Sequence, residues 1–404
     1  MPRLARLLAA GICLLTACSA GHAASATVSD RRPAKASCNP KLVLYWGQNS
    51  YGATHGRDTA NWERRLSYYC RSGQVSNVII SFMNVFGKEK PVLDLSSHCD
   101  DGRTFPGTKI PDCAELREDV KLCQELGVKV ELSLGGADGR YGFASDRQAI
   151  AFAEELHKMA FGGKGSVRPF GANSLDGINL DLENERPHGY AAFIRRLRQL
   201  QGPRGLLVTA APQCPYPDAS LHDVLVHAEV DAVYVQFYNN YCGMNAYGSR
   251  HFNFNTWAKW SQSVAMRRGA KVYLGVPGSA QSAGTGYASA ARIKTAAQQL
   301  ARDYPSVFGG VAVWDASTAY MNRQGRGNFV SAVHGALKGI CSNAAAPSSA
   351  TLDISLDGHN NKTHSMPMAN ATIALSANRS MEAAGTDAIA LTHVLQDAKL
   401  ASLT

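Results

Sequence analysis

Two acidic side chains interrupt an apolar segment near the middle of the chain. In this segment, residues 175–183, polar and apolar residues alternate toward the end: Asn179, Leu180, Asp181, Leu182, Glu183. An extended strand would place the polar side chains on one face, with neighbours about 6 to 7 Å apart along it. At that spacing one acid can donate a proton while the other balances charge. Asp181 and Glu183 are therefore candidate catalytic groups.

The position of this segment decides between two interpretations of the alternation. A strand at the protein surface would alternate in the same way, with its polar face in water. Helix-like segments flank residues 175–183 on both sides. A parallel strand between helices is buried on both faces and is normally apolar throughout. Because acidic side chains are seldom buried without a partner or a function, the context favours catalysis.

Eight apolar, β-branched segments recur along the chain and are the elements that must position these acids. They are Lys41 to Gly47, Val75 to Phe82, Val128 to Leu134, Leu175 to Leu182, Leu206 to Ala211, Val230 to Phe237, Lys271 to Val276 and Gly310 to Trp314. Segments of helical periodicity lie between several of them and end at Gly127, Gly162 and Gly202.

Strands that alternate with helices over about 300 residues predict an α/β fold, a closed (β/α)8 TIM barrel. A doubly wound open sheet is the structural alternative, but the nucleotide-binding forms of that fold carry a GxGxxG turn or a P-loop, and neither motif is present. Catalytic residues of such barrels lie where strands end, which is where Glu183 falls. Long loops are expected at Phe86 to Cys113 and near Tyr238 to Asn255.

The two ends of the chain differ in composition from the middle. Residues 1–26 have the basic, apolar and small-residue regions of a secretory signal peptide, although the stretch that ends at Cys18 would also suit a bacterial lipoprotein signal. Residues 38–341 are the expected catalytic domain. Residues 342–404 are rich in Ala, Ser, Asn and Thr and contain no aromatic residue, which predicts a disordered tail.

We expect a secreted protein, extracellular or in the cell wall, that makes no stable insertion into a membrane. Three glycosylation sequons, at Asn361, Asn370 and Asn378, are confined to the tail. Charged residues in the last twenty positions argue against a GPI signal.

The composition suits one large domain with appendages, since the chain has 404 residues, of which 45% are hydrophobic. Its formal charge is +9, but Lys and Arg are scattered, so we expect a solvated basic surface and no nucleic-acid partner. Ten cysteines occur, and all but Cys13 and Cys18 lie outside the signal region, which predicts disulfides. The chain contains no CxxC or HExxH motif that would support a metal site.

Several motifs in sequence order resemble the glycoside hydrolases of family 18, and in particular their compact fungal and plant class III chitinases. The segment 175–183 fits the family signature, and four further motifs match: YWGQN at 45–49, SLGG at 133–136, QFYNN at 236–240 and VWD at 313–315. The resemblance covers residues 41–318. It implies a TIM barrel without the α+β domain of larger members, because about thirty residues between Pro277 and Phe308 leave room for one helix.

The resemblance also implies retaining, substrate-assisted hydrolysis of chitin, in which the sugar's acetamido group attacks and forms an oxazolinium ion. Glu183 corresponds to the general acid, Asp181 to the residue that orients the acetamido N–H, and Tyr238 to the hydroxyl donor to the acetamido oxygen. The implied substrate-binding residues are Tyr45, Phe82, Gly136, Asn179, Gln236 and Trp314. Taken singly, each aromatic residue of this set would also suit ordinary core packing.

The same resemblance suggests the disulfide pairs Cys70 with Cys123, Cys99 with Cys113, and Cys214 with Cys242. The remaining pair, Cys38 with Cys341, would join the two ends of the domain.

One position departs from the pattern, because many family members carry Asp where this chain has Asn179. An amide does not ionise, so a like charge that would raise the pKa of Asp181 is missing. We expect Asn179→Asp to shift the acid limb of the rate profile.

The resulting prediction is a monomeric endo-acting chitinase without cofactor, whose partners are chitin and chito-oligosaccharides. One alternative is a catalytically weak or inactive barrel that acts as a lectin or inhibitor; family members of that kind typically lack the glutamate that this chain has at position 183. The other is an endo-N-acetylglucosaminidase that acts on glycoprotein glycans, against which the compact class III match counts.

Overall fold

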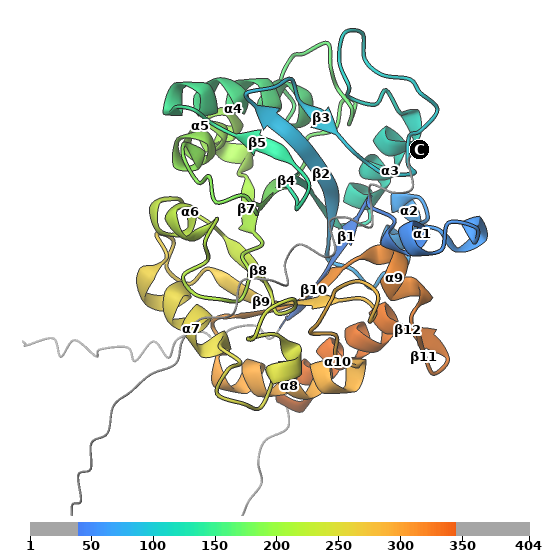
Figure 1. Ribbon diagram of the computed structural model, residues 1–404, viewed down its shortest axis with the longest axis vertical. Helices are drawn as coiled ribbons and strands as arrows, with labels where there is room; N and C mark the ends of the chain where they lie inside the picture. The colour runs from blue at the N-terminus through green and yellow to red at the C-terminus, as the bar shows by residue number, and fades with distance from the viewer. Residues whose placement is uncertain (1–38, 345–404) are drawn as a thin grey trace, which may run out of the picture. The chain divides into compact units, whose positions relative to one another are not determined.

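The computed structural model describes residues 39–344, with side chains up to 340. Eight parallel strands in this part form a closed ring, and the helices lie outside it, as Figure 1 shows. The predicted (β/α)8 barrel is thus confirmed. The predicted signal peptide at 1–26, the tail beyond residue 344 and Cys38 lie outside the described residues.

Each predicted strand has a counterpart in the ring. The ring order is β1 (Lys41–Trp46), β2 (Asn77–Gly87), β4 (Lys129–Gly135), β6 (Gly177–Asp181), β7 (Leu207–Ala210), β8 (Ala232–Gln236), β9 (Lys271–Pro277), β10 (Phe308–Trp314). The strand β1 pairs with both β2 and β10, so the ring closes and none of its strands has a free edge. The largest difference from prediction is β2, which continues past Phe82 to Gly87.

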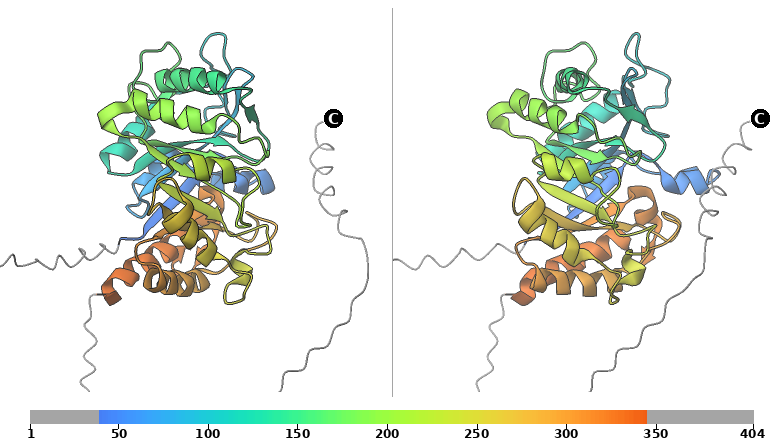
Figure 2. Two further views of the ribbon diagram at one scale, coloured as in Figure 1. Left: turned by 90° about the vertical axis from the view of Figure 1, so that its left-hand side faces the viewer. Right: turned by 60° about the vertical axis from the view of Figure 1, so that its left-hand side comes forward.

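The longer helices form because their sequences carry an apolar stripe of period 3.6 that packs on the outer face of the ring. They are α3 (Ala114–Glu125), α4 (Asp146–Ala160), α5 (Tyr190–Gln201), α8 (Ala290–Asp303) and α10 (Phe329–Ala344). Shorter helices are α1 (Ser50–Thr54), α2 (Leu66–Cys70), α6 (His222–His227), α7 (Phe254–Lys259) and α9 (Ala316–Met321). The side views in Figure 2 show these helices outside the strands. Within residues 39–344 no helix is long and apolar enough to cross a bilayer.

The apolar core has two parts, divided by the wall of the barrel. Side chains between the wall and the helices, such as Val130, Leu132 and Leu134 of β4, form the larger part. A smaller cluster fills the barrel interior and includes Val43, Tyr45, Ile79, Tyr234, Tyr273 and Ala312. Since side chains alternate along a strand, Glu131 and Ser133 of β4 point into the interior.

The loops carry the remaining features that were predicted. The bonds Cys70–Cys123, Cys99–Cys113 and Cys214–Cys242 are present. The expected Cys38–Cys341 bond lies outside the described side chains. In the loop after β2, the short strand β3 (Val92–Leu93) pairs antiparallel with β2. The short strand β5 (Arg140–Gly142), which follows β4, pairs with the end of β2. Between β9 and β10 the chain forms the single helix α8, as predicted.

Candidate active site

The strand β6 carries both candidate acids to the carboxyl end of the barrel. Asp181 is the last residue of β6, and Glu183 follows two residues later. Asp181 is 5% exposed, whereas Glu183 is half-buried at the rim. This is the arrangement that the alternating pattern predicts, with one acid inside the barrel mouth and the other above it.

Asp181 is held by the neighbouring strand β8. The Nε2 atom of Gln236 donates to Asp181 Oδ1 at 3.0 Å and to the backbone oxygen of Ala211 at 3.0 Å. Burial, followed by the negative charges of Glu183 and Asp218, raises the pKa of Asp181 well above its usual range, and the Gln236 hydrogen bond opposes this shift.

Glu183 is positioned through its backbone by Tyr141, a residue that the sequence analysis did not identify. The Tyr141 hydroxyl accepts a hydrogen bond from the Glu183 backbone N–H at 2.8 Å and donates to the Gly136 carbonyl oxygen at 2.9 Å. Burial is the main cause that raises the pKa of the Glu183 carboxyl; Gln236 opposes it, and Asp218 adds to it. A larger share of Glu183 therefore keeps its proton at a given pH than a free glutamate would.

Five of the predicted site residues line one small cavity of about 10 Å³ at the barrel mouth: Tyr45, Asp181, Gln236, Tyr238 and Trp314. The pKa of Tyr238 is raised by burial and then by the charges of Asp181 and Glu183, so its hydroxyl stays protonated and can donate. A cavity of this size has room for about one water-sized group.

The aromatic residues at the mouth pack against one another. Phe82 stacks on Trp314 with ring centroids 5.7 Å apart, and Tyr45 meets Trp314 edge-on at 5.6 Å. Phe82 and Tyr45 pack against part of the Trp314 indole ring and hold it in place. The ring remains partly exposed, so the rest of it is open to solvent.

The two glycines of the SLGG motif allow close approach of the chain to itself. Gly135 has a φ of +117°, and a Cβ there would lie 2.1 Å from the Asp181 carbonyl oxygen. Gly136 has a φ of +90°, donates its N–H to that oxygen at 2.7 Å and lies against the Phe82 ring. The family resemblance implies that Gly136 binds substrate. The structure gives a further reason for glycine at both positions, which is the close packing of the chain against Asp181 and Phe82.

Asn179 is fully buried and does not line the cavity. Its Oδ1 accepts from Ser133 Oγ at 2.9 Å and from the Tyr45 hydroxyl at 3.3 Å. Its Nδ2 donates to Thr209 Oγ1 at 2.9 Å. The structure thus places Asn179 under Tyr45.

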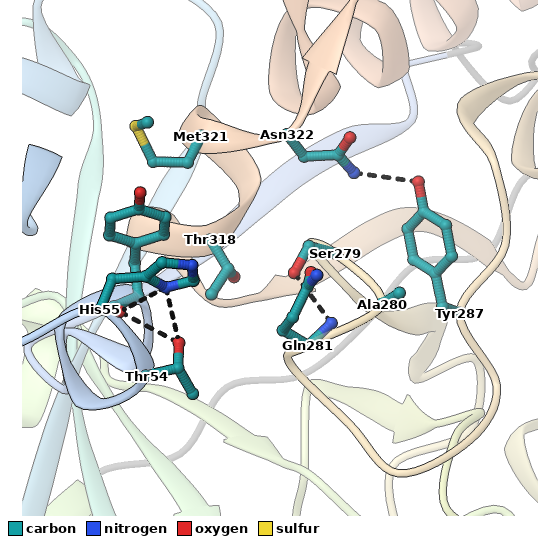
Figure 3. A pocket seen from close by; sticks show the side chains of 10 residues that line it. Thr54, His55, Ser279, Ala280, Gln281, Tyr287, Thr318, Met321 and Asn322 are labelled. Atoms are coloured by element: carbon teal, nitrogen blue, oxygen red, sulfur yellow. Dashed lines mark hydrogen bonds between the residues drawn. The ribbon is translucent and has the colours of Figure 1, made fainter.

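A larger cavity of about 270 Å³ lies beside α1 and α9 and contains none of the predicted site residues. Figure 3 shows Thr54 and His55 on one side of it and Tyr287 with Asn322 on the other. Tyr51 and His55 stack face to face there, with ring centroids 4.2 Å apart. The smaller cavity is the candidate site because Asp181 lines it and Glu183 follows Asp181 by two residues. No group of His, Cys, Asp and Glu side chains in the described part of the chain could hold a metal ion.

A (β/α)8 barrel with a close pair of acids of raised pKa at the carboxyl end of one strand is an arrangement suited to the cleavage of glycosidic bonds. The family model of the glycosyl hydrolases family 18 matches residues 41–331, and the chain belongs to this family.

Among its relatives is chitinase 2 of Rhizopus oligosporus, 43% identical over 324 residues, which cover 80% of this chain and 58% of that protein. Chitinase 1 of Rhizopus niveus is 42% identical over 317 residues, 78% of this chain and 62% of that protein. The endochitinase of Saccharomyces cerevisiae is 41% identical and covers 71% of this chain and 48% of that protein. The chain thus spans about half to three fifths of these relatives. The likeness fits the predicted class III group.

Two kinds of solved structure resemble the barrel. A chitinase from Ipomoea carnea superposes with a TM-score of 0.61 at 27% identity, covering 73% of this chain and 99% of that one. A xylanase and α-amylase inhibitor protein from Scadoxus multiflorus superposes with a TM-score of 0.60 at 34% identity, covering 73% of this chain and 98% of that one.

Proposed function

We propose that this chain is an endo-acting chitinase that cleaves β-1,4 bonds between N-acetylglucosamine units. The observation that carries the proposal is the pair of acids at the end of β6, both with raised pKa. Asp181 lines the small cavity together with Tyr238, and the charges of both acids act on the Tyr238 hydroxyl. The names of the relatives from Rhizopus and Saccharomyces support the choice of chitin as substrate.

In the proposed mechanism the reacting sugar lies on Trp314 and the methyl end of its acetamido group enters the small cavity. Tyr238 donates to the acetamido oxygen, and Asp181 accepts from the N–H. The acetamido oxygen attacks the anomeric carbon while the bond to the leaving oxygen breaks, and Glu183 gives its proton to that oxygen.

The product of this first step is an oxazolinium ion, whose positive charge Asp181 balances. Water then adds to the anomeric carbon on the face from which the leaving sugar departed, and Glu183 takes up the proton of that water. The two inversions at the anomeric carbon give net retention, and Glu183 returns to its protonated form without any cofactor.

The endo mode of action is proposed from the loops around the barrel mouth. Only α8 stands between β9 and β10, so no inserted domain walls the cleft on that side. A polymer can therefore lie across the mouth without threading its end. We also propose that the protein acts as a monomer outside the cell, on chitin of a cell wall.

A second function deserves comparison because inhibitor proteins share this barrel at 33 to 34% identity. A barrel that only binds carbohydrate or another enzyme has no need of a protonated acid at the rim. The Glu183 carboxyl, with a pKa raised by burial, favours the hydrolase.

The test compares release of soluble oligomers from colloidal chitin by the wild type, Glu183→Gln and the matched control Glu185→Gln, whose side chain is exposed. Loss of the general acid should reduce the rate about a hundredfold to ten-thousandfold, while the control stays within about twofold. Equal rates for Glu183→Gln and wild type would contradict the assignment. A wild type that binds chitin and inhibits amylase or xylanase without releasing oligomers would favour the inhibitor, and release of glycans from glycoproteins alone would favour an endo-N-acetylglucosaminidase.

A further inference from the structure

Glu131 is a buried acid that takes no part in the mechanism above. It lies on β4, is completely inaccessible to solvent, and points into the barrel below the active site. Its Oε1 accepts from Asn77 Nδ2 at 2.8 Å and from the Tyr234 hydroxyl at 3.1 Å, and its Oε2 accepts from Thr209 Oγ1 at 2.7 Å. All three donors are neutral. A buried carboxylate held only by neutral groups is expensive, and such groups are found most often where they serve a function.

The Thr209 hydroxyl connects Glu131 to the layer of side chains directly under the active site. Its single proton is used in the short bond to Glu131, so its oxygen is left to accept from Asn179 Nδ2 at 2.9 Å. This decides which way the Asn179 amide faces. The Oδ1 atom then points to Tyr45 and accepts a hydrogen bond from the Tyr45 hydroxyl.

The chain of hydrogen bonds runs over four strands, β1, β4, β6 and β7, of which β4, β6 and β7 are paired in register and hold it rigidly. Asn179 lies opposite Ser133 of β4 and opposite Thr209 of β7 in the parallel register. Every bond from Tyr45 through Asn179 and Thr209 runs in one direction and ends on the Glu131 carboxylate. At its other end, Tyr45 shares the small cavity with Asp181, whose charge raises the pKa of Tyr45 after burial.

We propose that Glu131 is a positioning residue of the active site, which orients the Asn179 amide and the Tyr45 hydroxyl beside Asp181 through Thr209. The inference rests on the proposed hydrolase function. It assigns Glu131 no contact with substrate, since the residue acts through its neighbours.

The ionisation of Glu131 makes this role visible in a pH profile. Burial raises the pKa of Glu131 to about 7, and the bonds from Asn77, Thr209 and Tyr234 limit the shift. The other titratable groups around it are Tyr45 and Tyr273, protonated at neutral pH because their pKa values are raised, and Asp176, which is paired with Lys129. Above pH 7 Glu131 therefore adds a negative charge below Asp181 and Glu183.

The sign of the effect follows from like charges. Glu131 lies level with Gly177, so at about 3.3 Å per residue its carboxylate is roughly 13 Å below Asp181 and roughly 20 Å below Glu183. At these distances its charge raises the pKa values of the two acids by a small amount and keeps Glu183 protonated to slightly higher pH. Removing that charge should move the alkaline limb of kcat to lower pH by about half a unit.

The experiment measures kcat, KM and the pH profile on a soluble chito-oligosaccharide for the wild type, Glu131→Gln, Thr209→Val and Thr209→Ser, with melting temperatures as a check on folding. Glu131→Gln should lower kcat about tenfold, leave KM within about twofold and shift the alkaline limb. Thr209→Val breaks the connection and leaves the Glu131 carboxyl in place, so it should lower kcat. Because Thr209 is one of the donors that limit the pKa of Glu131, the alkaline limb should move in the same direction as for Glu131→Gln, but by less. Thr209→Ser, which keeps the hydroxyl, should restore most of the loss.

If Glu131→Gln does not fold, the comparison of Thr209→Val with Thr209→Ser still tests the proposal, because valine matches threonine in shape and should fold. Folded Glu131→Gln and Thr209→Val proteins with wild-type kcat and wild-type limbs would overturn the inference while leaving the hydrolase proposal intact. An inactive wild type would instead overturn the proposed function.

Discussion

The substitution Asn179→Asp tests how strongly burial and neighbouring acids oppose a further carboxylate inside the barrel. It exchanges a buried neutral amide for an acid that lies two residues from Asp181 and one hydroxyl away from Glu131. Two carboxylates about 6.5 Å apart repel by about 2.5 kcal/mol at an effective dielectric constant of about 20. That repulsion makes the second proton of the pair harder to remove by about two pH units, whichever acid holds it, and burial raises the pKa of the new acid further.

A raised folded pKa turns into a loss of stability as the pH rises. Below about pH 4 the new acid is protonated in both the folded and the unfolded chain, so its charge has no effect. Above that value the unfolded chain releases the proton and the folded chain holds it. The free energy of unfolding therefore falls by about 1.4 kcal/mol per pH unit until the pH reaches the pKa of the folded state. The free energy of unfolding of Asn179→Asp, relative to wild type, should therefore be about 3 kcal/mol lower at pH 7 than at pH 4.

The measurement is urea denaturation followed by tryptophan fluorescence at pH 4 and pH 7. Asn179→Leu is the matched control, because it loses the same hydrogen bonds without gaining a charge and its penalty should not depend on pH. A penalty for Asn179→Asp that is equal at the two pH values, within about 0.5 kcal/mol, would refute the reasoning. The acid limb of the rate profile is the second readout, as the sequence analysis expects.

Two further substitutions test the groups that hold the acids. Tyr141→Phe removes the hydroxyl between the Glu183 backbone N–H and the Gly136 carbonyl oxygen, so kcat should fall about tenfold and unfolding should become easier by about 1 to 2 kcal/mol; unchanged kcat would contradict the role given to Tyr141. Gln236→Leu removes the donor that lowers the pKa of Asp181, so the acid limb of kcat/KM should move to higher pH, and a move to lower pH would count against it.

The elements of the barrel could be predicted because each carries its own local signal. Most of the strands are rich in apolar residues, as strands covered by helices usually are, and helices such as α4 show an apolar stripe that ends at a glycine. Boundaries were less certain where tertiary contacts extend an element. Thus β2 runs on to Gly87 because β5 and β3 pair with it beyond the ring.

The acids of the site could also be predicted, but most of their supports could not. Tyr141 reaches Glu183 across 42 positions of sequence, and Thr209 reaches Glu131 across 78, so no local pattern shows either contact. Glu131 could have been found from the sequence. It is an acid within the apolar run of β4, and because it is two residues from Ser133, its side chain points to the same inner face of the barrel. The amide of Asn179 was interpreted as a substrate contact, whereas the parallel register brings Ser133 and Thr209 to its two sides.

The pairing of β1 with β10 has a consequence for how the chain folds as it is synthesised. The first strand of the ring leaves the ribosome well before its final neighbour, since roughly 260 residues separate Trp46 from Phe308. At typical elongation rates of about 5 to 20 residues per second, one edge of β1 waits unpaired for more than ten seconds. Over that interval the growing sheet has two open margins, and unpaired strand edges of this kind can pair with other chains.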